Sequence, residues 1–173
     1  MRVFVTGGAG FIGSYVCEIL LQNGAEVVAF DDFSTGQTRI DGAEIVEGDV
    51  RNFDEVLSAM AGCTHIAHLA ALASVPASVA NPALSEAINL QGTLNVIEAA
   101  HQNGVKRIVF SSTAAVYGNP TNLKPVNEED QLKPLNPYGE SKIKTENYLK
   151  ENSKINYIIL RYFNVAGADP LLR

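Results

Sequence analysis

The sequence predicts an α/β domain of the Rossmann type, a doubly wound parallel sheet of about six strands with helices on both faces. The first observation is a glycine-rich turn between a short apolar strand, residues 2–5, and an amphipathic helix, residues 11–21. The second is that strands and helices continue to alternate along the chain, which implies right-handed crossovers between parallel strands. The third is a row of hydroxyl side chains expected at the end of a strand, followed by a helix that carries Tyr138 and Lys142.

The glycine-rich turn has the spacing Gly8-x-Gly10-x-x-Gly13 and lies between strand and helix, as dinucleotide-binding turns do. Glycine has no Cβ, so the backbone can bend tightly and approach a pyrophosphate. Free N–H groups at the helix start, together with the helix dipole, then hold the negative charge. The alternative is a glycine-rich turn without a ligand.

The second strand, residues 25–30, is followed by Asp31 and Asp32. An acid about 20 residues past the glycines can accept a hydrogen bond from a ribose 2′-hydroxyl, and it would repel a 2′-phosphate. We therefore expect NAD rather than NADP, and we assign the ribose contact to Asp31, the first residue after the strand. The alternative, stronger for Asp32, is that the two acids only open the polar loop of residues 32–42.

The remaining elements follow from the same patterns. Short apolar runs predict strands at residues 43–47, 64–69, 106–110 and 156–161. Helical periodicity predicts helices at residues 53–61, 82–101 and 137–150. Asn52 and Glu55 have the spacing of a capping box at the start of the first of these helices. Asn89 lies among apolar residues of the second, which indicates a buried polar role.

Composition limits the class of protein. The chain has 173 residues, enough for one domain over residues 1–173, and its net charge of −6 with no basic cluster argues against nucleic acid and anionic membranes as partners. Two cysteines make no disulfide framework, and no apolar run approaches the ~18 residues that span a bilayer. With no leader expected, we predict a cytoplasmic protein. His65 and His68 flank a core strand without an acid or cysteine at ligand spacing, so we expect no metal site.

Residues 111–136 lack periodicity and contain three prolines, so we expect a long loop that is functional or disordered. Its first residues, Ser111, Ser112 and Thr113, carry hydroxyls at the carboxyl end of the preceding strand. Asn136 followed by Pro137 then signals the start of a helix.

On that helix Tyr138 and Lys142 are four residues apart and project from one face. An ammonium group and an oxidised nicotinamide would both lower the pKa of the tyrosine. The phenolate could then take a proton from a substrate hydroxyl while hydride leaves the same carbon. The alternative is a tyrosine stacked on a lysine stem at a helix surface.

Seven segments resemble the extended short-chain dehydrogenase/reductases, in the NAD-dependent epimerase/dehydratase group, and are most similar to UDP-glucose 4-epimerases. They are Thr6-Gly-Gly-Ala-Gly-Phe-Ile-Gly13, Gly48-Asp49-Val50, His68-Leu-Ala-Ala71, Asn89-Leu-Gln-Gly-Thr93, Ser111-Ser-Thr-Ala-Ala-Val-Tyr-Gly118, Tyr138-Gly-Glu-Ser-Lys142 and Arg161-Tyr-Phe-Asn164. They occur in the family's order along the whole chain.

The resemblance implies a catalytic set of Thr113, Tyr138 and Lys142, with NAD as cofactor and a UDP-hexose as substrate. It implies cofactor contacts from Gly7, Gly10, Phe11, Ile12, Asp31, Asp32, Asp49, Val50, Leu69, Ala70, Ala71, Asn89, Ser111, Tyr138, Lys142, Tyr162 and Phe163. Substrate contacts are implied for Thr113 and Asn164.

The family's dehydratases carry an Asp-Glu pair after the Ser/Thr, where this chain has Ala114 and Ala115, so the resemblance favours epimerisation over dehydration. It also implies a homodimer through the helices at residues 82–101 and 137–150. Family members continue for roughly as long again with a C-terminal substrate domain that this sequence lacks. Two functions therefore stand, a minimal sugar-nucleotide epimerase and a non-catalytic NAD-binding module or subunit that a partner completes.

Overall fold

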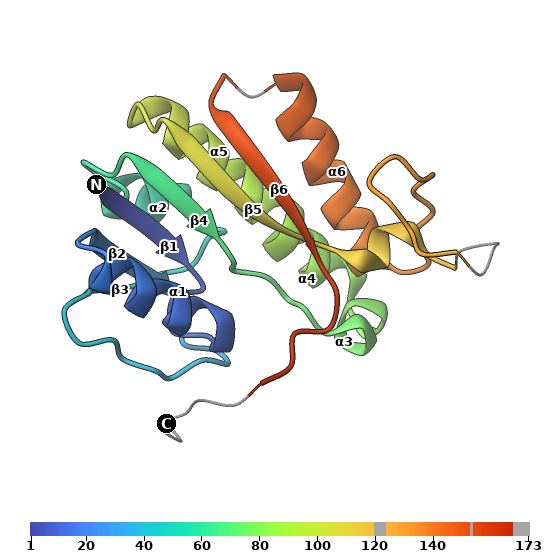
Figure 1. The fold of residues 1–173 in the computed structure, drawn as a ribbon, viewed down its shortest axis with the longest axis horizontal. Coiled ribbons are helices and arrows are strands. Elements are labelled where there is room, and N and C mark those ends of the chain that lie inside the picture. Colours follow the sequence, from blue (N-terminus) through green and yellow to red (C-terminus); the bar gives the residue numbers. More distant parts are fainter. Residues whose placement is uncertain (120–123, 153, 168–173) are drawn as a thin grey trace.

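A six-stranded parallel sheet forms the centre of the molecule, as the sequence predicts (Figure 1). Its strands are β1 (Arg2–Thr6), β2 (Glu26–Asp31), β3 (Glu44–Glu47), β4 (His65–His68), β5 (Arg107–Thr113) and β6 (Asn156–Tyr162). The strand order is β3-β2-β1-β4-β5-β6, so the direction of winding reverses between β1 and β4. The computed structural model describes residues 1–119, 124–152 and 154–167, so part of the expected loop, including Pro120, lies outside the described residues.

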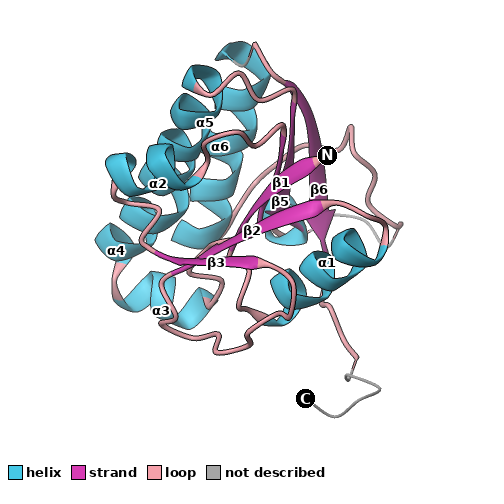
Figure 2. Cartoon of the chain, turned by 90° about the vertical axis from the view of Figure 1, so that its left-hand side faces the viewer, coloured by secondary structure: helices cyan, strands magenta, loops and turns pink. Residues whose placement is uncertain are grey.

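Helices cover both faces of the sheet (Figure 2). They are α1 (Phe11–Gln22), α2 (Phe53–Ala59), α3 (Val75–Ala80), α4 (Pro82–Glu86), α5 (Gly92–Gln102) and α6 (Pro137–Asn152), with a π-helical turn η1 (Ala87–Gln91) and a 3₁₀ turn η2 (Ala114–Tyr117). In Figure 2, α1 packs on one face of the sheet, and α2, α5 and α6 pack on the other.

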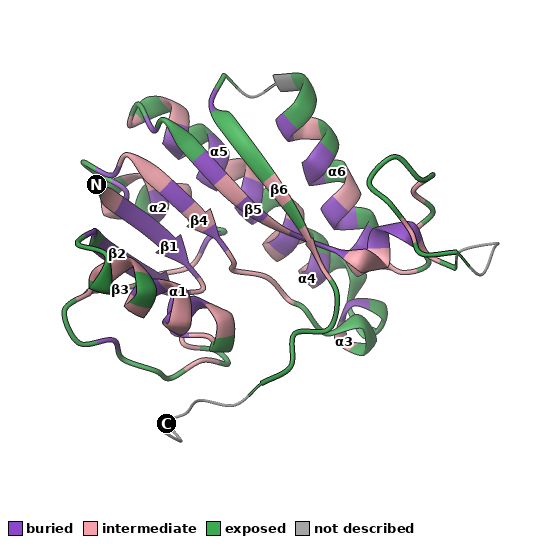
Figure 3. Cartoon of the chain, in the orientation of Figure 1, coloured by how far each residue is buried: buried purple, intermediate pink, exposed green. Residues whose placement is uncertain are grey.

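Alternating side chains of the central strands supply two apolar cores. Phe4 of β1 faces the core that includes Val56 of α2, Ile97 of α5 and Leu149 of α6. Val5, the next residue of the same strand, faces Cys17 and the rest of α1. Because side chains of a strand alternate between faces, a sheet covered on both sides needs the nearly continuous apolar runs seen in the sequence. The buried strands at the centre contrast with the exposed outer half of β6 (Figure 3).

Two helical segments differ from the prediction. The single helix expected at residues 82–101 is three segments, because the π-helical turn Ala87–Gln91 separates α4 from α5. The short helix α3 was missed, although Ser74 caps it by accepting a hydrogen bond from the backbone N–H of Ala77 at 3.2 Å. Ser followed by a proline in the first turn is a helix-start signal, so this element could have been found.

The end of β5 also differs. Ser111, Ser112 and Thr113 belong to the strand rather than to a loop, because they continue the parallel pairing with Leu160, Arg161 and Tyr162 of β6. The sequence alone could not reveal this pairing, since Ser111–Thr113 is polar and its partner strand is more than 40 residues away. The hydroxyls nevertheless lie at the carboxyl end of the strand, as expected.

Asn52 caps α2 as predicted, but Glu55 does not complete the predicted capping box. Asn52 accepts hydrogen bonds from the backbone N–H groups of Asp54 and Glu55. Glu55 does not reach back to the Asn52 backbone as a capping box requires. Its carboxylate accepts instead from the Asp49 backbone N–H at 2.9 Å and the Asn52 side chain at 2.7 Å.

Candidate active site

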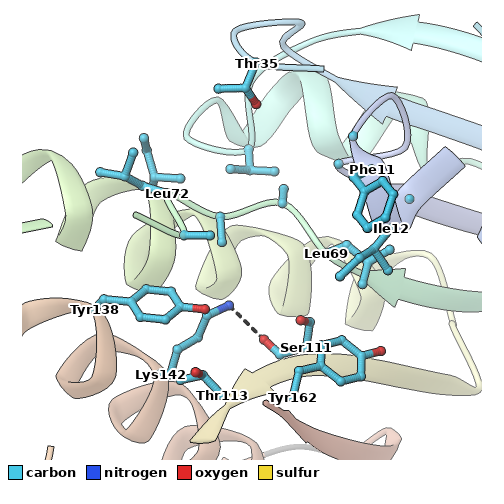
Figure 4. A pocket seen from close by; sticks show the side chains of 18 of the residues that line it. Phe11, Ile12, Thr35, Leu69, Leu72, Ser111, Thr113, Tyr138, Lys142 and Tyr162 are labelled. Atoms are coloured by element: carbon cyan, nitrogen blue, oxygen red, sulfur yellow. Dashed lines mark hydrogen bonds between the residues drawn. The ribbon is translucent and has the colours of Figure 1, made fainter. Parts of the chain in front are cut away.

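A cavity of about 740 Å³ lies at the carboxyl ends of the strands (Figure 4). Parallel strands bring all these ends to one edge, so turns far apart in the sequence meet there. The residues of the predicted site that line the cavity are Gly7, Gly10, Phe11, Ile12, Asp31, Asp32, Asp49, Val50, Leu69, Ala70, Ala71, Ser111, Thr113, Tyr138, Lys142, Tyr162, Phe163 and Asn164. Asn89 is the exception and lies behind the wall.

The glycine-rich segment between β1 and α1 has no room for a side chain at Gly7 or at Gly13. Gly7 has a φ of +68°, a conformation that favours glycine, and a Cβ on it would come within 2.8 Å of the Ala70 backbone nitrogen. A Cβ on Gly13 would collide with the Gly7 carbonyl oxygen. The first N–H groups of α1 have no carbonyl partner within the helix, which is the geometry of an anion site at a helix start. The turn therefore fits a pyrophosphate.

Asp31 is the last residue of β2 rather than the first residue after it. One carboxylate oxygen accepts from the Ala9 backbone N–H and the other from the Phe33 backbone N–H, both at 2.9 Å. These bonds orient a carboxylate that still has lone pairs for a ribose hydroxyl. Asp32 lines the cavity too, and it accepts from the backbone and hydroxyl of Ser34.

The segment after β4, which forms one wall of the cavity, is fixed by side-chain hydrogen bonds at Leu69–Ala70 and again at Leu72. Thr6 Oγ1 accepts from the backbone N–H groups of Leu69 and Ala70, each at 3.2 Å. Asn89 accepts from the Leu72 N–H at 2.7 Å and donates to the Leu72 carbonyl at 3.2 Å. Asn89 is fully buried on η1. The structure therefore places Asn89, predicted as a cofactor contact, behind the cavity wall, which it supports through Leu72.

His68 connects these two supports and is fully buried. Its Nδ1 lies 2.7 Å from Thr6 Oγ1, and its Nε2 lies 2.8 Å from Thr93 Oγ1. Thr6 Oγ1 already accepts two backbone N–H groups, so its own hydrogen points to Nδ1. The Thr93 hydroxyl donates to the Asn89 carbonyl at 2.7 Å, so it accepts from His68. We infer a neutral imidazole protonated on Nε2, consistent with the structural role expected from sequence.

Lys142 is 1% exposed, and its Nζ donates to the Ser111 carbonyl at 2.8 Å (Figure 4). Nζ also lies 4.8 Å from the centroid of the Phe110 ring and 5.9 Å from that of Tyr138. Burial lowers the pKa of Lys142 to about 7, so the side chain titrates near neutral pH.

Tyr138 points into the cavity beside Lys142 and Thr113 (Figure 4). Burial raises the pKa of Tyr138, and only the hydrogen bond with Thr113 opposes this. The expectation that Lys142 lowers the pKa of Tyr138 is therefore wrong for the protein alone. A buried lysine that itself sheds its proton near neutral pH offers a phenolate little charge.

Sequence reasoning missed several residues of the cavity wall, among them Ser34, Thr35, Leu72, Ala73 and Val75. Val75 starts α3, so the helix-start signal at Ser74 could have located it. The loop that carries Thr35 has no such signal. It is brought to the cavity by a tertiary contact, in which the Thr38 N–H donates to the Ala9 carbonyl at 3.3 Å.

Comparison with known proteins agrees with this geometry. The profile of the NAD dependent epimerase/dehydratase family matches residues 3–171. The chain belongs to this family. It is 40% identical over 176 residues to a UDP-glucose 4-epimerase of Azospirillum brasilense, a match that covers 98% of this chain and 50% of that protein.

Solved structures of the family have the same fold. The chain superposes on the UDP-glucose 4-epimerase of Thermus thermophilus, solved with NAD, with a TM-score of 0.92 and 40% identity over 98% of this chain and 58% of that one. It superposes on a UDP-N-acetylglucosamine 4-epimerase of Methanobrevibacter ruminantium with a TM-score of 0.89 and 34% identity, covering 99% of this chain and 59% of that one. The chain thus spans about half the length of the curated relatives it matches.

The described residues contain neither a membrane-spanning helix nor a cluster of metal ligands. None of the helices there combines the length and apolar character needed to cross a membrane. Within the same residues, no three His, Cys, Asp or Glu side chains are grouped so that they could hold a metal ion.

The buried His68 generates a prediction for the pH dependence of stability. Burial lowers the pKa of His68 from 6.5 to about 3, so the unfolded chain binds a proton that the folded chain does not. His68 therefore stabilises the fold above pH ~6.5, and this stability is lost as pH falls toward 3, with a slope of up to about 1.4 kcal/mol per pH unit. NMR of histidine-labelled protein should show His68 neutral and protonated on Nε2 down to pH ~4. Titration of its ring signals near pH 6.5 in folded protein would contradict the assignment.

Proposed function

We propose that this chain binds NAD in the cavity and carries the catalytic centre of a nucleotide-sugar epimerase of the UDP-glucose 4-epimerase type, which acts on a UDP-hexose by transient oxidation at C4. The observation that carries the proposal is that Thr113, Tyr138 and Lys142 line the same cavity as the glycine turn. A protein that only bound a dinucleotide would not need a tyrosine buried beside a lysine and a hydroxyl group.

The residues of the cavity fit NAD along its length. The turn from Gly7 to Ile12 would hold the pyrophosphate, Asp31 and Asp32 the adenosine ribose, and Asp49 and Val50 the adenine. The wall from Leu69 to Ala71 would lie along the cofactor, with Ser111 beside it and Tyr162 and Phe163 behind the nicotinamide. Acids at the ribose would repel a 2′-phosphate, which favours NAD over NADP.

When bound, NAD supplies the acceptor and donor of the C4 hydride, and the charge of its nicotinamide favours ionised Tyr138. The tyrosine needs this help because burial raises its pKa. Tyr138 Oη then takes the proton of the sugar's C4 hydroxyl and later returns it, with the Thr113 hydroxyl sharing that proton. Lys142 would hold the nicotinamide ribose, and Asn164 would contact the sugar nucleotide.

The wall beyond Thr113 favours epimerisation over dehydration. Ala114 and Ala115 line the cavity at this point. Elimination of water needs an acid and a base near the leaving hydroxyl, and two alanines supply neither. Oxidation at C4 followed by reduction from the other face needs only the tyrosine and the hydride carrier.

A second candidate is an NAD-binding subunit whose pocket another polypeptide completes. It is favoured by the match to about half the length of the relatives and by the exposed apolar side chains Ile158, Leu160 and Phe163. These side chains are 43%, 37% and 66% exposed, and Phe163 also lines the cavity. We further propose a cytoplasmic homodimer that associates through residues 82–101 and 137–150.

Replacement of Tyr138 by Phe tests the catalytic proposal. With NAD and UDP-galactose, the parent chain should form UDP-glucose, measured by chromatography, and Tyr138→Phe should lower the rate at least ~100-fold because the proton carrier is lost. Tyr157→Phe, on the exposed part of β6, is the matched control and should keep full activity. No conversion by the parent, with a melting temperature that NAD raises, would support the second candidate instead. No response to NAD at all would contradict both.

Replacement of Gly13 by Ala tests the cofactor site. The added methyl collides with the Gly7 carbonyl, and displacing that carbonyl deforms the pyrophosphate turn. Overpacking costs about 1–3 kcal/mol, so NADH affinity, measured by NADH fluorescence, should fall about tenfold or more. Gly62→Ala introduces a methyl at a φ of +74° with open space around it, and it should leave NADH affinity unchanged. Equal affinity of Gly13→Ala and parent would argue against this turn as the pyrophosphate site.

A further inference from the structure

A third polar side chain shares the helix face of the catalytic pair. Glu146 follows Lys142 by four residues and Tyr138 by eight, so all three project from the same side of α6. Glu146 is fully buried, although nothing in its sequence position suggested a role. A buried carboxylate is costly unless it is paired, so its partners indicate what it does.

The Glu146 carboxylate binds two strands at once. One oxygen accepts from Ser112 Oγ of β5 at 2.5 Å and from Arg161 Nε of β6 at 3.0 Å. The other accepts from Arg161 Nη2 at 2.7 Å and lies 3.4 Å from Lys150 Nζ. Burial tends to raise the pKa of Glu146, but the bonds from Arg161 and Ser112 hold it below its usual value. The group is therefore a charged, two-pronged anchor.

Arg161 extends the anchor to the segment after Thr113. Its Nη1 donates to the Tyr117 hydroxyl at 2.9 Å and to the Glu128 carbonyl at 3.2 Å. Its guanidinium also lies 5.0 Å from the centroid of the Tyr117 ring. Arg161 directly precedes Tyr162, which lines the cavity.

Glu146 contacts β5 at Ser112, which lies between the two residues of β5 that contact Lys142 and Tyr138. Ser112 follows Ser111, whose carbonyl accepts from Lys142, and precedes Thr113, which bonds Tyr138. The helix is thus tied to consecutive residues of one strand at Lys142 and again at Glu146. Sliding or rotation of α6 would leave a buried charge without its partners.

Resting on the function proposed above, we propose that Glu146 and Arg161 form a positioning pair that sets the register of α6 against β5 and β6 and so aligns Tyr138 with Thr113 and the substrate hydroxyl. Neither residue touches the reacting atoms. The consequence of loosening the pair is large, because a displacement of about 1 Å at a reacting group can cost ~100-fold in rate.

Variants that weaken the contacts of Glu146 to different degrees distinguish an effect on the position of α6 from an effect on the stability of the fold. Ser112→Ala removes one hydrogen bond and leaves the ion pair, and Ser112→Thr keeps the hydroxyl. Arg161→Lys keeps the charge and loses the two-pronged contact. Lys150→Gln is the matched control, because Lys150 is also a partner of Glu146 but its side chain is 44% exposed.

For each variant we would measure kcat and KM with UDP-galactose, NADH affinity and the melting temperature. We expect kcat to fall about tenfold in Ser112→Ala and further in Arg161→Lys. KM and NADH affinity should stay within about twofold of the parent, because Arg161 does not line the cavity and the hydroxyl of Ser112, which does, is donated to Glu146. Ser112→Thr and Lys150→Gln should resemble the parent. An unchanged kcat in folded Ser112→Ala and Arg161→Lys would overturn the proposal.

A readout without turnover distinguishes this proposal from the function on which it rests. The phenolate absorbance of Tyr138, taken as the difference from Tyr138→Phe, can be titrated in NAD-loaded protein. The hydrogen bond with Thr113 lowers the pKa of Tyr138, so loss of alignment with Thr113 should raise the midpoint by about half a pH unit in Ser112→Ala and not in Lys150→Gln. A parent without epimerase activity but with this shift would overturn the function alone, and an unshifted midpoint would overturn the positioning pair.

Discussion

Polar groups buried at the carboxyl edge of the sheet must find partners, and this constraint organises the rest of the molecule. The parallel arrangement gathers six strand ends at one edge, where backbone groups no longer pair within the sheet. Thr6 satisfies two such groups beyond β4, and Asn89 satisfies two more at Leu72. The cavity is open because these side chains support its wall from behind rather than filling it.

The π-helical turn that carries Asn89 shows how local irregularity serves this support. A π-turn adds a residue and disturbs the regular helical hydrogen bonds. The Thr93 hydroxyl bonds the Asn89 carbonyl within this helix and links it to His68. A chain of hydrogen bonds thus runs from Thr6 of β1 through His68 of β4 to Thr93 of α5, and each of these side chains limits the movement of the next.

The side of the cavity that holds Tyr138 and Lys142 differs, because ionisable side chains are buried there. Within the described residues, Lys142 Nζ bonds a carbonyl and no carboxylate, and burial lowers the pKa of Lys142 to about 7. Glu146, one turn further on, is buried with a guanidinium and keeps its charge. Helix α6 therefore carries one buried side chain that titrates near neutral pH, Lys142, and one that stays ionised there, Glu146. The ionised one is the residue that we propose to fix the register of the helix.

Much of this protein follows from its sequence alone. The period of apolar residues determines the strands and helices, the glycine spacing and following acid determine the type of ligand site, and Tyr138 with Lys142 indicates the chemistry, because each of these signals is local. Only the tertiary structure decided that Ser111–Thr113 is strand, that Asn89 supports the wall, that burial raises the pKa of Tyr138, and that Glu146 meets Arg161. These features depend on pairing and burial between residues distant in the chain, which no pattern of neighbouring residues encodes.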